Sequence, residues 1–284
     1  MSPTPRPIAS SVDALEVDAA VVEELLCGFI RDEVHKVGFE SVVVGASGGV
    51  DSSLVVALAC RALGPEHVYP VNMPYRTSSV ESEEDARAVC AQYGIEPAIE
   101  GITEQIDAYF ARHADAGVTR RGNKMARERM TILYDLSVEH RSLVLGTSNK
   151  TELLLGYGTL FGDMASALNP IGDLYKMQVY AMGRALGLPE RVLTKAPSAD
   201  LWVGQSDEEE LGLRYAIVDV VLFRLIDERR SRAEVVAMGF DADLVDDVVR
   251  RVRASQYKRR PPVIAKVSER TIDRDFRYPR DWGL

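Results

Sequence analysis

The feature that most restricts the fold of this chain is a short apolar run that ends in glycine and leads into a helical pattern. Ser41–Gly45 reads S-V-V-V-G, and residues 142–146 repeat the pattern as S-L-V-L-G. Runs of this length, rich in β-branched residues, are typical of strands buried on both faces of a parallel sheet. Parallel neighbours need long crossovers, which are usually helices. The sequence therefore predicts an α/β fold.

The rest of the chain alternates in the same way. Further strands are predicted at 67–72 and 96–99, and the helical patterns between and beyond the strands cover 18–37, 52–63, 79–93, 102–114, 125–140 and 211–230. This order predicts a doubly wound parallel sheet flanked by helices, with ligands at its carboxyl edge and a helical C-terminal extension. We expect a disordered N-terminal tail over 1–17 and a single domain over 18–284.

Composition excludes several classes of protein. The formal net charge of −9 argues against a nonspecific nucleic-acid binder, because such proteins need a basic face. Cys27, Cys60 and Cys90 lack C-x-x-C spacing and are odd in number, which fits a reducing cytoplasm. No apolar run approaches the ~20 residues of a membrane span. We therefore expect a cytoplasmic protein without a nucleic-acid or membrane partner.

The strongest local signal is the loop G-A-S-G-G-V-D-S-S that starts at Gly45. Small residues let backbone N–H groups approach phosphate oxygens, and the following helix adds the favourable field of its N-terminus. The loop is neither a Walker A sequence nor a dinucleotide fingerprint. A plain glycine turn capped by Asp51 is the alternative, but the complete pattern favours phosphate binding. The candidate contacts are Gly45, Ala46, Ser47, Gly48, Gly49, Val50, Asp51 and Ser52.

Polar residues also follow the strand at 142–146. Glu152 falls near the carboxyl edge of the sheet, where it would join Asp51 as a hard oxygen ligand for Mg²⁺. Thr147 is a candidate contact for the nucleotide, and Lys176 a candidate for neutralising a phosphate. Each residue alone is common on protein surfaces; their joint placement indicates a site.

The segment after the strand at 67–72 gives a weaker signal. Met73 is a candidate for packing on adenine, and Arg76 for reaching the phosphates. A plain strand-to-helix connection explains the segment equally well.

The loop S-G-G-V-D-S resembles that of the ATP pyrophosphatases, which cut ATP into AMP and pyrophosphate. Three further segments, at 122–130, 145–176 and 195–201, resemble signatures of the NAD synthetase family, and the likeness covers about residues 22–260. It implies the adenine nucleotide alpha hydrolase-like fold. By position it implies metal ligands at Asp51 and Glu152, and a further ATP contact at Ser198. Deamido-NAD contacts are implied at Arg127, Tyr257 and Lys258, and a place for Asp163 near the reacting carboxyl. The catalytic set is then Asp51, Lys176 and Asp163.

The resemblance implies amidation of deamido-NAD by ammonia at the expense of ATP, with Mg²⁺, in a homodimer. Leu160, Ala167 and Tyr257 depart from the better-known bacterial pattern, which has a lysine, an aspartate and a histidine there. These departures concern the nicotinate pocket. The alternatives are another ATP pyrophosphatase, such as a GMP synthetase-like or tRNA-modifying enzyme, and a non-catalytic module that binds adenine nucleotides. Delivery of ammonia by a separate glutamine-hydrolysing partner also remains open.

Overall fold

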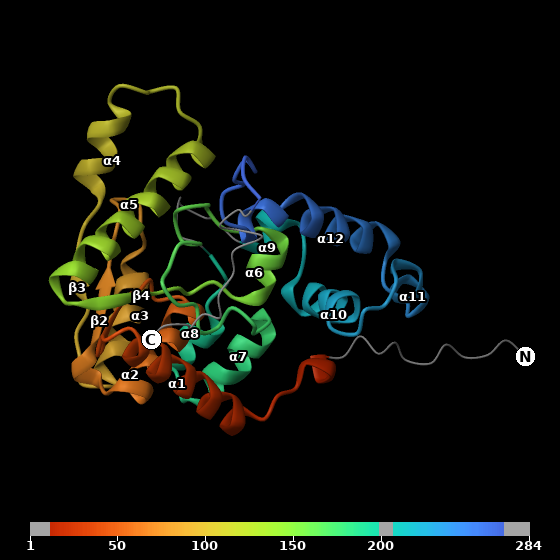
Figure 1. Ribbon diagram of the computed structural model, residues 1–284, viewed down its shortest axis with the longest axis horizontal. Helices are drawn as coiled ribbons and strands as arrows, with labels where there is room; N and C mark the ends of the chain where they lie inside the picture. Colours follow the sequence, from red (N-terminus) through yellow and green to blue (C-terminus); the bar gives the residue numbers. More distant parts are fainter. Residues whose placement is uncertain (1–11, 199–206, 270–284) are drawn as a thin grey trace, which may run out of the picture.

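The computed structural model describes residues 12–198 and 207–269 and confirms the parallel sheet (Figure 1). Four parallel strands lie in the order β3-β2-β1-β4. The strand order reverses between β1 and β4. In doubly wound sheets, ligands bind in the crevice at the carboxyl ends of the two strands where the order reverses. The strands are β1 (Ser41–Gly45), β2 (Val68–Asn72), β3 (Ala98–Ile99) and β4 (Ser142–Leu145).

Helices cover both faces of the sheet and form the C-terminal part. The helices of the sheet region are α1 (Ala19–Lys36), α2 (Val50–Leu63), α3 (Val80–Ala91), α4 (Thr103–Phe110), α5 (Val118–Glu139), α6 (Lys150–Leu155), α7 (Lys176–Ala185) and α8 (Glu190–Thr194). Those that follow are α9 (Asp207–Leu211), α10 (Tyr215–Ile226), α11 (Arg232–Ala237) and α12 (Ala242–Ala254). Short 3-10 helices occupy Val12–Leu15, Pro65–His67 and Gln256–Arg259.

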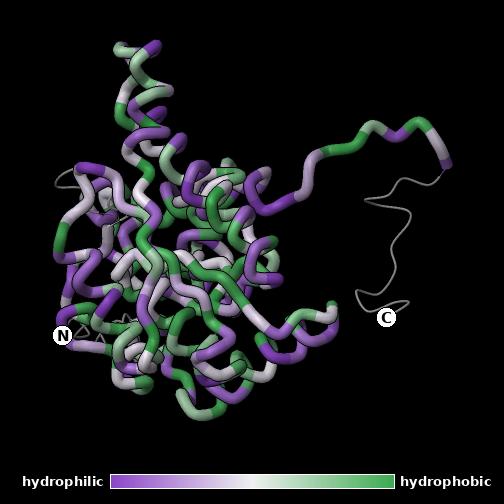
Figure 2. The backbone as a smooth tube through the Cα atoms, turned by 90° about the vertical axis from the view of Figure 1, so that its left-hand side faces the viewer, coloured by the Kyte–Doolittle hydropathy of each residue, from purple (hydrophilic) through white to green (hydrophobic). Residues whose placement is uncertain are grey.

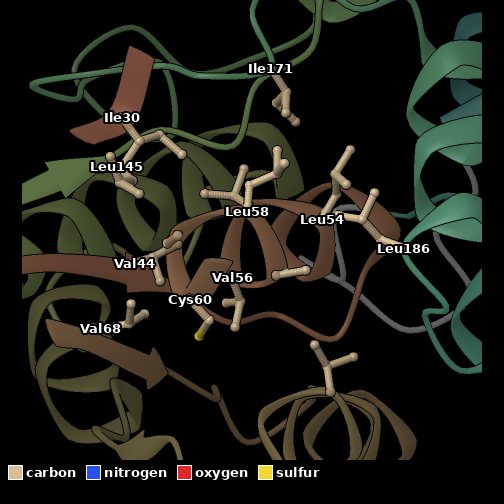
Figure 3. Packing of buried hydrophobic residues seen from close by; sticks show 14 of the residues in the cluster. Ile30, Val44, Leu54, Val56, Leu58, Cys60, Val68, Leu145, Ile171 and Leu186 are labelled. Atoms are coloured by element: carbon tan, nitrogen blue, oxygen red, sulfur yellow. The ribbon is translucent and has the colours of Figure 1, made fainter. Parts of the chain in front are cut away.

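The strand β1 separates two apolar clusters because successive side chains point to opposite faces. Val42 and Val44 pack with α1, α2 and α7, whereas Val43 packs with α5 on the other face. Figure 3 shows part of the first cluster, in which Leu54 of α2 lies beside Leu186 and Leu58 lies between Leu54 and Val44. Burying a leucine of this kind stabilises the fold by roughly 1.5–3 kcal/mol. The central strand and α2 are thus held rigidly, which fixes the loop between them.

A third apolar cluster joins the C-terminal helices to the site region. It is centred on α10, with Val218, Val221 and Leu222 fully or almost fully buried, and it includes Tyr175 and Leu155. On the opposite side of the molecule α4 and the first half of α5 project from the body (Figures 1 and 2). None of the helices in the described ranges is long and apolar enough to cross a bilayer.

Several sequence-based boundaries were wrong: the helix predicted at 102–114 ends at Phe110, and the strand predicted at 96–99 is limited to Ala98–Ile99. Residues 12–17 are not all tail, because Val12–Leu15 forms a 3-10 helix whose Leu15 is buried against α10; residues 1–11 lie outside the described ranges. The helix predicted at 125–140 begins at Val118, and its polar first half lines a cavity instead of a core. The helix predicted at 211–230 is divided between α9 and α10, because Gly212 adopts a φ of 65°.

Candidate active site

The loop between β1 and α2 is shaped by serine hydroxyls and one glycine in a left-handed conformation. Ser52 Oγ accepts a hydrogen bond from Ser47 N–H at 3.2 Å and donates one to the Gly49 carbonyl at 3.1 Å. Gly48 has a φ of 78°, and a Cβ there would overlap the carbonyl oxygen of Ser82. No side chain caps α2 at Gly49, so the positive end of the helix faces the cavity. This geometry suits an anion.

Lys176 joins the ends of β1 and β4. Its Nζ lies 2.5 Å from Asp51 Oδ2 and 3.3 Å from Glu152 Oε1, and only 3% of its side chain is exposed. Burial, together with the charge of Asp51, raises the pKa of Glu152 to about 8, although the Lys176 ammonium acts in the opposite direction. Burial alone would lower the pKa of Lys176, but the charges of Asp51 and Glu152 outweigh it and raise that pKa. The ammonium therefore remains charged.

Asn149 completes a ring of contacts around the two carboxylates. Its Nδ2 donates to Asp51 Oδ1 at 2.8 Å, and its backbone N–H donates to Glu152 Oε2 at 3.2 Å. Its Oδ1 accepts from the Glu152 N–H at 3.0 Å, which makes a capping box at the start of α6. Each carboxylate thus gives one oxygen to Asn149 and the other to Lys176. The two side chains cannot rotate without losing a contact.

A second polar group lies on the loop between α6 and α7. Asp163 Oδ1 accepts a hydrogen bond from the Thr159 N–H at 2.8 Å. Lys258 Nζ donates to the carbonyls of Gly156 and Gly158, both at 2.7 Å. Desolvation lowers the pKa of Lys258. Asp163 of this loop and Lys258 of the 3-10 helix Gln256–Arg259 therefore line the same cavity.

The phosphate loop, the Lys176 ring and Asp163 surround one cavity of about 720 Å³. Most of the candidates from the sequence line it: Gly45, Ala46, Ser47, Gly49, Val50, Asp51, Ser52, Met73, Thr147, Glu152, Asp163, Lys176, Ser198 and Lys258. Gly48, Arg76, Arg127 and Tyr257 are not among the lining residues.

The residues outside the cavity have other surroundings. Arg76 is 60% exposed in its side chain and pairs with Asp107 at 2.9 Å. Arg127 Nε donates to the Leu160 carbonyl at 3.1 Å, and Tyr257 is 62% exposed. Ala167, which departs from the bacterial pattern, donates its N–H to the carbonyl of Val144 and so lies beside β4. For Arg76, Arg127 or Tyr257 to contact a ligand in the cavity, a loop would have to rearrange or a second subunit would have to contribute the residue.

Sequence reasoning missed several residues of the site. Asn149 was the most readable of them, because N-K-T-E is an asparagine followed three residues later by glutamate, which is a helix-start pattern. Thr119 and Asn123 of α5 also line the cavity. They were missed because the polar stretch before residue 125 was not read as helix.

A metal ion would have two protein carboxylates available. No group of three or more His, Cys, Asp and Glu side chains that could hold a metal occurs within residues 12–198 and 207–269. Asp51 and Glu152 nevertheless supply the hard oxygen atoms that Mg²⁺ prefers, and the ammonium between them shows that a cation fits there. The remaining oxygen ligands would have to come from phosphate and water.

Comparison with known proteins agrees with this geometry. Residues 22–262 match the sequence profile of the NAD synthase family. The NH(3)-dependent NAD(+) synthetase of Trichlorobacter lovleyi is 58% identical over 269 residues, which cover 95% of this chain and 98% of that protein.

Solved structures are similar over the same region. The NH3-dependent NAD synthetase of Campylobacter jejuni, in complex with the nitrate ion, has a TM-score of 0.75 and 36% identity, and covers 88% of this chain and 100% of its own. The NMN synthetase of Francisella tularensis has a TM-score of 0.78 and 27% identity, and covers 88% and 99%. The parallel sheet carries the Lys176 ring at the ends of β1 and β4, in agreement with these likenesses. The chain therefore belongs to the NAD synthase family.

Proposed function

We propose that this protein catalyses the ATP-dependent amidation of deamido-NAD by ammonia, with NAD, AMP and pyrophosphate as products. The observation that carries the proposal is the ring of contacts among Lys176, Asp51, Asn149 and Glu152 beside the phosphate loop. It combines a buried ammonium and two carboxylates at the uncapped start of a helix. Such a site suits a triphosphate and its counter-ion.

The chemistry follows from the weakness of a carboxylate as an acyl donor. The nicotinate carboxylate of deamido-NAD attacks the α-phosphorus of ATP; the bond to the β,γ-part breaks, and pyrophosphate leaves. Ammonia then attacks the adenylated carbonyl, the bond to AMP breaks, and one proton is lost as the amide forms. Lys176 stabilises the charge that develops on the phosphates in the first step. Asp163, which lines the cavity, would take the proton in the second.

Asp51 and Glu152 would hold Mg²⁺, with the phosphates completing its oxygen shell. When bound, the ion supplies charge neutralisation for the triphosphate. The phosphate loop and Lys176 line the same cavity and would orient the triphosphate. Ser198 and Met73 line the cavity at positions that suit the rest of the nucleotide.

We further propose a homodimer and a reducing, cytoplasmic location. Arg127 and Tyr257 are absent from the lining of the cavity, which supports a deamido-NAD site that a second subunit completes. Tyr134 and Val138, one turn apart on α5, expose 42% and 79% of their surface and would suit such a contact. Cys27, Cys60 and Cys90 are buried free thiols, as a reducing compartment allows. Light scattering of the purified protein tests the dimer, and a monomeric mass at micromolar concentration would contradict it.

The test of the activity is release of pyrophosphate by purified protein with ATP, Mg²⁺, ammonium and deamido-NAD. Each component is omitted in turn, and the dinucleotide product is identified by chromatography and mass. The expected result is NAD formation that requires all four. Nicotinate mononucleotide replaces deamido-NAD in a parallel reaction, because a similar structure is that of an NMN synthetase. Pyrophosphate release that is independent of deamido-NAD would contradict the proposal and favour another acceptor.

A further inference from the structure

A buried carboxylate outside the cavity contacts both elements that carry the charged ring. Asp219 lies on α10, and its exposed surface is 0%. Thr151 Oγ1 donates to Asp219 Oδ1 at 2.5 Å, and the Met177 N–H donates to Oδ2 at 2.8 Å. Thr151 precedes Glu152 on α6, and Met177 follows Lys176 on α7. Asp219 therefore connects the C-terminal helices to the residues on either side of the site.

The start of α7 depends on these contacts. Its N-cap residue, Tyr175, supplies no side-chain hydrogen bond to the first turn. The Lys176 N–H instead donates to Thr151 Oγ1 at 3.0 Å, and the next N–H donates to Asp219. Unpaired N–H groups at a helix start favour a negative charge. The Gln178 side chain accepts from the Tyr175 N–H, and Thr151 and Asp219 accept from the next two N–H groups, which fixes the backbone of Lys176.

The Thr151 hydroxyl has one proton, and the geometry decides where it goes. Because Thr151 Oγ1 accepts from the Lys176 N–H, its own proton is directed to Asp219. Thr151 is itself completely buried, so water does not compete for these bonds. A neutral asparagine at 219 would leave the hydroxyl or the Met177 N–H with a poorer acceptor.

The charge of Asp219 is unfavourable for the fold. Burial raises its pKa to about 6, against the hydrogen bonds of Thr151 and Met177 and the charge of Lys176, which lower it. Among the described residues its hydrogen-bond donors are the Thr151 hydroxyl and the Met177 backbone amide, and neither carries a charge. An amide of the same shape would avoid the cost of burying a charge, at the expense of one of the two hydrogen bonds. We therefore attribute the carboxylate at this position to a role in the site and not to a gain in the stability of the fold.

We propose that Asp219 is a positioning residue, which acts through Thr151 and the first turn of α7 to hold the Lys176 ammonium between Asp51 and Glu152. The inference rests on the proposed function, since it assigns a role within that reaction. Residues that orient the groups around a metal or phosphate site commonly change activity by about 10–100-fold when they are altered. Asp219 does not reach the cavity, so it should leave substrate affinity almost unchanged.

The test compares Asp219→Asn and Thr151→Val with wild type. In both variants kcat for NAD formation should fall by about ten-fold or more, whereas KM for ATP and deamido-NAD should change by less than about two-fold. Thr151→Ser keeps the hydroxyl and should restore most of kcat. The double variant should lose little more than either single one, because both changes break one chain of contacts. The midpoint of thermal unfolding of Asp219→Asn should stay within about 2 °C of wild type.

Asp241→Asn is the matched control, because Asp241 also accepts a backbone N–H at a helix start, that of Leu244 in α12, far from the site. Because asparagine caps a helix about as well as aspartate, this variant should change the unfolding midpoint little and leave kcat unchanged. Wild-type kcat in Asp219→Asn, or a loss that follows a lower unfolding midpoint, would overturn the inference, as would equal losses in Thr151→Ser and Thr151→Val. Failure of the wild-type protein to form NAD would instead contradict the proposed function.

Discussion

Asn149 donates its side-chain amide to Asp51 across 98 positions of sequence, and this bond joins the loop after β4 to the loop after β1. The same residue caps α6 and holds Glu152. The spacing of the two carboxylates is therefore set by a neutral residue between them, and the consequences can be measured.

Replacing Asn149 by aspartate would place a third carboxylate against Asp51 without changing the size of the side chain. We expect kcat to fall by about 10–100-fold and the Mg²⁺ concentration for half-maximal activity to change, because the orientation of both carboxylates is lost. Steady-state rates at a series of Mg²⁺ concentrations provide the measurement. Gln92→Glu, a similar change in an exposed amide that bonds the Gly187 carbonyl, is the control. Equal kinetics in the two variants would show that Asn149 does not contribute to activity.

Replacing Lys176 by methionine would leave two buried carboxylates without their ammonium. Breaking a buried pair in this way typically costs about 3–5 kcal/mol, and a divalent cation should recover part of it. We expect a lower unfolding midpoint in EDTA that rises on addition of Mg²⁺, more than in wild type. Lys150→Met removes a more exposed pair with Asp227 and should show no such response. If the unfolding midpoint of the Lys176 variant does not change with Mg²⁺, this result would argue against a metal at Asp51 and Glu152.

Gly48→Ala should damage the phosphate loop. The added Cβ would overlap the Ser82 carbonyl, and a φ of 78° is unfavourable for alanine, so we expect a loss of about 1–3 kcal/mol in the free energy of unfolding. Binding of ATP should weaken as well. Gly28→Ala, where nothing lies within 4 Å of the new atom, should stabilise α1 by up to about 1 kcal/mol. Urea unfolding and calorimetric titration with ATP measure both effects. Equal stabilities would show that the loop can shift.

Arg76→Ala separates a binding role from a surface ion pair. The pair with Asp107 is exposed and should contribute no more than about 1 kcal/mol to stability. If Arg76 reaches the phosphates during turnover, KM for ATP should rise by about ten-fold with an unchanged unfolding midpoint. The control is Arg87→Ala, which removes a similar exposed pair with Glu83 on α3. An unchanged KM would leave Arg76 as a surface residue.

The sequence was most informative where strand ends and glycine patterns coincide. Gly45 and the loop after it could be placed because a buried strand must be followed by a turn at the carboxyl edge, and Glu152 could be placed by the same reasoning. The start of α5 at Val118 was missed, because a helix whose polar face lines a cavity lacks the apolar period of a core helix. Asp219 was missed because its partners, Thr151 and Met177, are brought together only by the packing of α10.

The residues of the Lys176 ring, and the residues Thr151 and Asp219 that support it, lie far apart along the chain. This separation has a consequence for biosynthesis. Asp51 and Lys176 are separated by 125 positions, and Thr151 and Asp219 by 68. Contacts of such separation form late, because the intervening chain must first be synthesised and folded. A chain still emerging from the ribosome would thus display its phosphate loop before the lysine and the helix that complete it. We therefore expect the complete nucleotide site to form only after α10 has been made.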